Sequence, residues 1–130
     1  MKAQTKAILR KVKKLILERP TQFQMVSWFD DYNSIMEPAG GCGTAACIAG
    51  WAVAIEQKVE LLSDVTDLNW RSNDMEERAG NFLGLTVVER KNLFYMDNWP
   101  DVFRDAYGES HTVKQAAEAA AVRIEHFIKT

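Results

Sequence analysis

The sequence is poor in several features that would assign it quickly to a class. Its 130 residues contain two cysteines, two histidines and three prolines. Two cysteines do not make a disulfide framework, and no apolar run approaches the roughly eighteen residues of a membrane-spanning helix. Near the N-terminus, charged residues interrupt every apolar run, so the unbroken apolar core of a secretory signal is missing. We therefore expect a cytoplasmic protein with no membrane partner.

The composition is that of one folded domain. Hydrophobic residues make up 47% of the chain and charged residues 26%, proportions typical of a globular protein. A length of 130 residues suits a single hydrophobic core, so we assign residues 1–130 to one domain. The formal net charge of -2 provides no general attraction for a polyanion, which makes nucleic acid a disfavoured partner.

Helix signals recur along the chain, whereas strand signals are poor. Apolar residues at helical spacing predict a first helix from Ala3 to about Glu18, stopped by Pro20. The segment Thr21–Asn33 could hold a short helix or an extended piece. Val59–Arg71 fits a continued helix, a short helix or an extended loop, and we expect an irregular segment with some helix. Further helix starts and stops follow, at Asn73 with Glu76, Gly84, Thr86 with Glu89, Pro100, Gly108, and Thr112 with Gln115.

Two of these later helices have a predicted buried face. In the short helix that we expect to begin with Pro100 as its first residue, Val102, Phe103 and Tyr107 should point inward. The last helix has a seam of helical period, formed by Val113, Ala117, Ala120, Ile124 and Phe127. This alanine-rich helix could pack within the domain or pair with its twin in a homodimer, and the pattern does not distinguish the two.

The stretch Gly40–Ala54 is the one around which the chain is organised. It passes from a glycine-rich loop into a helix of very small side chains, which we expect to begin at Thr44 and to continue to about Lys58. Glycine and alanine allow other backbones to approach closely. The predicted fold is all-α, a single-domain compact helical bundle of about five to seven helices around this buried small-residue central helix.

Cys42 is the candidate nucleophile or redox residue. It precedes the expected N-terminus of the central helix, where the helix dipole stabilises a thiolate. The neighbouring Gly40, Gly41 and Gly43 would let a substrate approach. Cysteines in apolar surroundings are more often packing residues, so we assign no catalytic residue.

Three alternatives remain for the two cysteines: a thiol enzyme, a disulfide and a zinc site. A thiol enzyme would need His111 or His126 as its base, and both are distant in sequence. A disulfide between Cys42 and Cys47 is disfavoured by a reducing cytosol. A zinc site would require these four residues to converge from an unusual spacing. We therefore predict neither a metal nor a cofactor.

Trp70 is the aromatic residue best placed for recognition. It lies beside Asn69 and Arg71 in a polar segment, where an exposed ring would suit a binding surface, whereas we expect most of the four tryptophans to be buried. Together with the glycine loop it defines a candidate binding site. That site consists of Gly40, Gly41, Cys42, Gly43, Thr44, Cys47, Trp70 and Arg71.

The first helix has a basic outer face of Lys6, Arg10, Lys13 and Lys14. Such a face is most often simply solvated, but it could meet an acidic partner or nucleic acid. No exposed aromatic residues alternate with these charges, and this favours the solvated face.

Four motifs carry a resemblance that covers most of the chain after Phe23. They are Cys42-Gly-Thr-x-x-Cys47-x-Ala-Gly-Trp51-Ala, Ala79-Gly-x-x-Leu-Gly-Leu85, Leu93-Phe-Tyr-x-x-x-Trp99-Pro and Arg123-Ile-x-His126-Phe-Ile. In these motifs the chain resembles a group of small helical proteins of unknown function encoded in bacteria and phages. The resemblance implies a shared helical fold and no particular activity.

These observations favour a non-enzymatic cytoplasmic binding or regulatory module, whose ligand is either a small molecule or a protein partner. Loop glycines and spare aromatic residues suit a recognition surface, and catalytic motifs are missing from the sequence. The alternatives are a cysteine-dependent enzyme or redox sensor that uses Cys42, and a nucleic-acid contact through the basic first helix.

Overall fold

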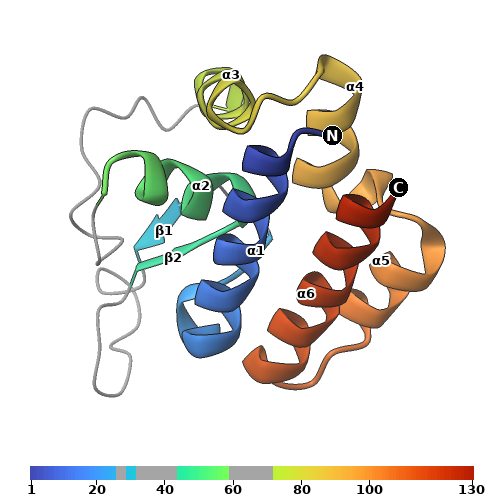
Figure 1. Ribbon diagram of the computed structural model, residues 1–130. Helices are drawn as coiled ribbons and strands as arrows, with labels where there is room; N and C mark the ends of the chain where they lie inside the picture. The colour runs from blue at the N-terminus through green and yellow to red at the C-terminus, as the bar shows by residue number, and fades with distance from the viewer. Residues whose placement is uncertain (26–28, 32–43, 59–71) are drawn as a thin grey trace.

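The computed structural model describes residues 1–25, 29–31, 44–58 and 72–130. The fold is all-α, as predicted, with two three-residue strands beside the helices (Figure 1). None of the helices in the described ranges is long and apolar enough to cross a membrane. In chain order the elements are α1 (Ala3–Glu18), η1 (Pro20–Gln22), β1 (Phe29–Asp31), β2 (Thr44–Ala46), α2 (Ile48–Glu56), α3 (Ser72–Leu83), α4 (Val87–Phe94), η4 (Met96–Asn98), α5 (Asp101–Gly108) and α6 (Val113–Lys129).

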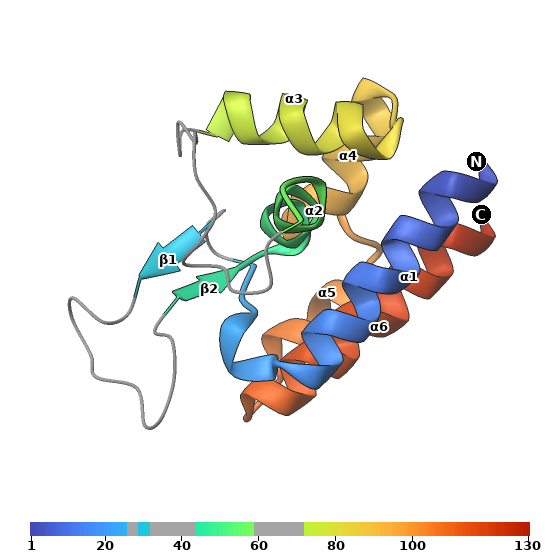
Figure 2. The same ribbon diagram turned by 60° about the vertical axis from the view of Figure 1, so that its left-hand side comes forward.

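Helices α1 and α6 lie side by side and antiparallel, which brings the two chain termini close together (Figures 1 and 2). The predicted bounds of α1 are confirmed. Its buried face includes Leu9, Val12 and Ile16, which recur at the three- and four-residue spacing of a helix. At the edge of the interface, Lys13 Nζ lies 2.7 Å from Glu125 Oε1 of α6.

Helix α2 is the buried central helix that the sequence predicts. Every residue from 48 to 54 is buried, and the helix packs against α1, α3 and α4. Its predicted start at Thr44 is wrong, because α2 begins at Ile48 with Cys47 at the N-cap. Thr44 instead belongs to β2, which pairs antiparallel with β1 with Asp31 opposite Thr44. Pairing with a distant segment overrides the local capping signal.

The capping signals of the C-terminal half are correct in part. Thr86 and Glu89 form both reciprocal hydrogen bonds of a capping box at the start of α4. The Thr112 hydroxyl accepts a hydrogen bond from the Gln115 backbone N–H. The side-chain oxygen of Gln115 accepts from the backbone N–H of His111 and not from that of Thr112. The reciprocal pairing of Thr112 with Gln115 is therefore formed on one side only.

Of three further predictions of helix boundaries, one is confirmed and two are wrong. Gly84 has a φ of 73°, the left-handed conformation that ends α3 as predicted. Asn73 is not a helix cap, since α3 already includes Ser72. Pro100 is the residue before α5 rather than its first residue.

Two valines that we expected to be buried are exposed. Val102 in α5 is 68% exposed and Val113 in α6 is 50% exposed. Phe103 and Tyr107 pack against the core from α5, so this helix needs no further inward side chain. An eight-residue helix has barely two turns, and its sequence pattern fixes the buried face only loosely.

A buried arginine lies directly over a glycine of α3. Arg90 is 8% exposed, and its guanidinium donates to the Leu85 carbonyl oxygen at 3.3 Å. A Cβ atom on Gly80 would lie 2.6 Å from Arg90 Nε, closer than two such atoms can approach. The absence of a side chain at position 80 therefore makes room for Arg90.

Gly80→Ala is expected to lower the free energy of unfolding by about 1–3 kcal/mol, because the new methyl group overlaps Arg90. In an Arg90→Ala background, the same change should be neutral or should stabilise by up to about 1 kcal/mol, since alanine is the better helix former. Urea unfolding of the four proteins measures both effects. An equal cost in the two backgrounds would show that the contact with Arg90 is not the cause.

The second prediction concerns the acid stability of the α1–α6 contact. The hydrogen bond from Lys13 lowers the pKa of Glu125 from its ordinary 4.5, and Arg10 and Lys129 lower it further. A depressed carboxyl pKa stabilises the fold above the unfolded-state pKa, and this stabilisation is lost as the pH falls through the folded-state pKa. Glu125→Gln should therefore destabilise the protein at neutral pH and make little difference in acid.

Unfolding free energies of the wild type and Glu125→Gln, measured between pH 7 and the acid limit of folding, test this dependence. Glu118→Gln is the matched control, because Glu118 is an exposed glutamate of the same helix and forms no ion pair with any described residue. A Glu125 effect that persists unchanged in acid would contradict the assignment.

Candidate functional site

The structure places only part of the predicted binding site. Thr44 is the first residue of β2, and Cys47 is the N-cap of α2. The other six residues lie outside the described residues, and their role stays a prediction. These are Gly40, Gly41, Cys42, Gly43, Trp70 and Arg71.

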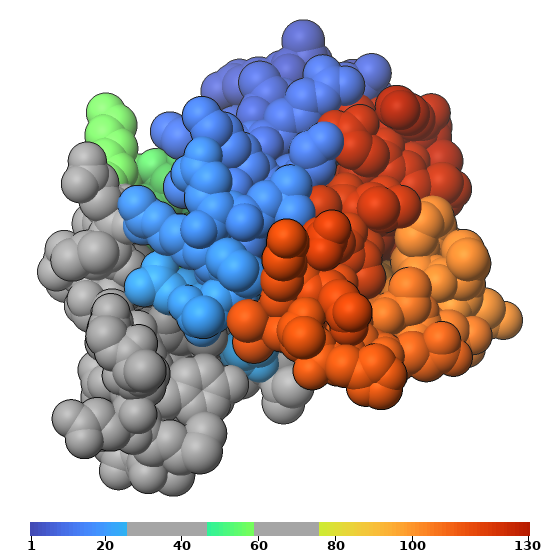
Figure 3. All heavy atoms as spheres, turned by 90° about the horizontal axis from the view of Figure 1, so that it is seen from below, coloured from blue at the N-terminus to red at the C-terminus, as the bar shows by residue number. Residues whose placement is uncertain are grey.

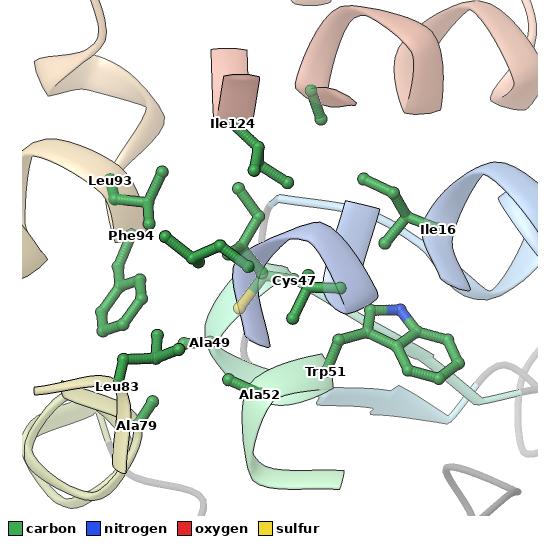
Figure 4. Close-up of a cluster of buried hydrophobic side chains, with 14 of the residues drawn as sticks. Ile16, Cys47, Ala49, Trp51, Ala52, Ala79, Leu83, Leu93, Phe94 and Ile124 are labelled. Atoms are coloured by element: carbon green, nitrogen blue, oxygen red, sulfur yellow. The ribbon is translucent and has the colours of Figure 1, made fainter. Parts of the chain in front are cut away.

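Cys47 is a core residue. Its side chain is 2% exposed and lies in the middle of a cluster contributed by α1, α2, α3, α4 and α6 (Figure 4). Burial raises the pKa of its thiol from 9.0 to about 11, although backbone hydrogen bonds at Gly50 and Ala49 oppose the shift. Because the thiolate is the reactive form, Cys47 is a poor nucleophile in the folded protein.

The two histidines lie on or next to α6. His126 Nδ1 accepts a hydrogen bond from Arg123 Nη1 at 3.1 Å, since a guanidinium can only donate. Its ring packs against Phe103 of α5 with the ring centroids 4.8 Å apart. His111 lies in the turn between α5 and α6. In the described part of the chain, no three His, Cys, Asp or Glu residues are grouped closely enough to hold a metal ion.

A pocket of about 480 Å³ lies between α1 and α2. The C-terminal part of α2, in green, lies beside α1, in blue, at the surface in Figure 3. The apolar residues that line the pocket are Leu15, Trp51, Ala54 and Ile55. The indole N–H of Trp51 donates to the Gln22 carbonyl oxygen at 3.2 Å. The remaining lining residues are Lys11, Arg19 and Lys58. We call this the α1–α2 pocket.

The charged residues that line the α1–α2 pocket in the described part of the chain are all positive. Lys11 and Lys58 form no ion pair with any described residue, and none of the described lining residues carries a carboxylate. Arg19 and Lys58 follow the C-terminal ends of α1 and α2, where the helix dipole itself favours a cation. Lys11 lies within α1, beyond the reach of that effect, so its charge remains available to a ligand.

Sequence reasoning missed this pocket. Lys11, Leu15 and Arg19 recur every four residues and therefore share one face of α1. On α2, Trp51 and Ile55 share a face in the same way, and Lys58 follows two residues after the end of the helix. These stripes can be found in the sequence, but their meeting depends on how the two helices pack.

Comparison with known proteins assigns no function to the α1–α2 pocket. No family model, curated protein or solved structure matches the chain. The resemblance to small helical bacterial and phage proteins accordingly stays a prediction.

Alkylation should distinguish the buried Cys47 from an activated thiol. A pKa of about 11 in place of 9.0 lowers the thiolate fraction at neutral pH by about a hundredfold, and burial slows access further. In a Cys42→Ser variant, we expect iodoacetamide to modify Cys47 at least about a hundred times more slowly in buffer than in denaturing urea. Mass spectrometry of the intact protein follows the reaction. Modification at the rate of an exposed thiol would contradict the placement of Cys47.

Proposed function

We propose that this chain is a non-enzymatic binding module whose ligand is a small amphipathic anion held in the α1–α2 pocket. The observation that carries the proposal is the pocket's lining, in which three basic side chains surround an apolar floor. Such a lining suits a ligand with an apolar body and a carboxylate, sulfate or phosphate group. A volume of about 480 Å³ falls within the range of small-molecule sites.

Binding is favoured over catalysis by the groups that the pocket offers. Among the residues that the structure describes, its lining contains no imidazole, carboxylate or thiol for acid–base or nucleophilic chemistry. The described cysteine, Cys47, is buried with a raised pKa. A reducing cytoplasm is part of the proposal, because it would keep this thiol intact. The alternative enzyme reaction would depend on Cys42, which lies outside the described residues.

Contacts within the domain account for much of the basic face of α1. Arg10 Nε and Lys13 Nζ lie 3.5 Å and 2.7 Å from Glu125 Oε1, and Lys14 Nζ lies 3.8 Å from Glu18 Oε1. These ion pairs give the residues a structural use that requires no nucleic acid. They support ligand binding in the α1–α2 pocket over the nucleic-acid alternative.

Three naphthalene derivatives with different charges test the proposal. Naphthalene-1-sulfonate, 1-naphthol and 1-naphthylmethylammonium share one apolar body, so differences in affinity report on the charge of the head group. We expect the sulfonate to bind about tenfold more tightly than the alcohol, because the lysines attract it, and the ammonium to bind most weakly. Isothermal titration calorimetry measures the three affinities.

Variants locate the binding. Lys11→Gln combined with Lys58→Gln should reduce the affinity for the sulfonate to that for the alcohol. The control is Lys114→Gln, which removes an exposed lysine of α6 that does not line the pocket. Equal affinities for the three compounds, or an equal effect of the control, would sink the proposed function.

A further inference from the structure

A second concave surface lies between α5 and α6, and it shares no lining residue with the α1–α2 pocket. This α5–α6 groove has a volume of about 590 Å³. The two helices reach the surface in orange and red on the right of Figure 3. The groove is lined by Val102, Phe103, Ala106, Glu109, Ser110, His111, Gln115, Glu118, Ala119 and Val122.

The floor of the α5–α6 groove is apolar and open to solvent. Val102 is 68% exposed and Val122 is 58% exposed, one on each helix. Phe103 is only partly buried and lies between the groove and the core. Apolar side chains gathered in one open groove are typical of a surface that a partner covers.

The charge of the groove limits the chemistry of that partner. Glu109 and Glu118 line it, and neither forms an ion pair with any other described residue. Asp101 and Asp105 of α5, which precede Glu109, are both engaged by Arg104 at 2.7 Å and 3.7 Å. An unbalanced negative rim favours a cationic partner and repels phosphate groups of lipids or nucleic acid.

The backbone of the groove limits the shape of the partner. Both walls are α-helices, whose peptide groups are hydrogen-bonded within each helix, so neither wall offers an edge to an extended strand. A partner segment that lies on them has to satisfy its own backbone groups, which an α-helix does. We propose that the α5–α6 groove docks a cationic amphipathic helix of a partner protein.

A second copy of this chain fits the groove less well. The chain's own cationic amphipathic helix is α1, and its apolar residues Leu9, Val12 and Ile16 are already buried in the domain. A symmetric contact between two grooves would bring Glu109 and Glu118 of one copy close to the same acidic residues of the other. Charge and packing therefore both favour a different protein as the occupant.

Two labelled peptides test this proposal on the full chain. One is a helical peptide of leucine and lysine with leucines along one face, and the other carries glutamate in place of each lysine. We expect the lysine peptide to bind at least about tenfold more tightly than the glutamate peptide, as measured by fluorescence anisotropy. Glu109→Gln combined with Glu118→Gln should remove most of this preference.

Paired valine variants locate the contact. Val102→Ser with Val122→Ser should weaken binding of the lysine peptide by about tenfold, through loss of apolar contact. Val88→Ser with Val113→Ser is the control, since these valines are also exposed and lie outside the groove. Val88 matches Val102 closely, because each is 68% exposed and is the second residue of an eight-residue helix.

Three outcomes would overturn the proposal. They are equal binding of the two peptides, equal loss in the two valine pairs, and a wild-type dimer in sedimentation that the groove valines hold together. The last outcome would assign the groove to a second copy of the chain. The glutamine variants keep the test valid if a valine pair fails to fold, because both glutamates are exposed.

Discussion

The close packing of α2 is the constraint on which the rest of the structure depends. Ala49, Gly50 and Ala52 project little or nothing from the helix, so neighbouring helices can approach it closely. Trp51 is the large exception, and its indole bonds to the backbone at Gln22, just after α1. Larger side chains at the small positions would push α1, α3 and α4 away from their common centre.

The same packing divides α2 into two functionally different ends. At its N-terminus, Cys47 is enclosed by side chains from five helices, and burial suppresses the chemistry of its thiol. At its C-terminus, Ile55 and Lys58 reach the surface beside α1. A helix whose N-terminal end is buried thus supplies one wall of the α1–α2 pocket at its other end.

Local patterns predicted several features that neighbouring residues decide, and they failed at short helices and where distant segments meet. The bounds of α1 and the box of Thr86 with Glu89 depend on residues within a few positions of one another, and both predictions are confirmed. The start of α2 was misplaced because Thr44 pairs with Asp31, a contact that no capping pattern contains. Val102 was misplaced because eight residues define a helical face poorly. The α1–α2 pocket requires a helix-packing geometry that neither stripe specifies alone.

A net charge of -2 conceals two surfaces of opposite sign. On α1, helical periodicity separates two sets of basic residues. Arg10 and Lys13 lie three residues apart and face Glu125 of α6, whereas Lys11 is turned about 100° from Arg10 toward α2. Glu125 therefore neutralises the side of α1 that meets α6 without neutralising the α1–α2 pocket. The acidic α5–α6 groove uses none of these residues. An anionic ligand and a cationic helix would consequently bind through independent charges, and occupancy of one surface leaves the lining residues of the other unengaged.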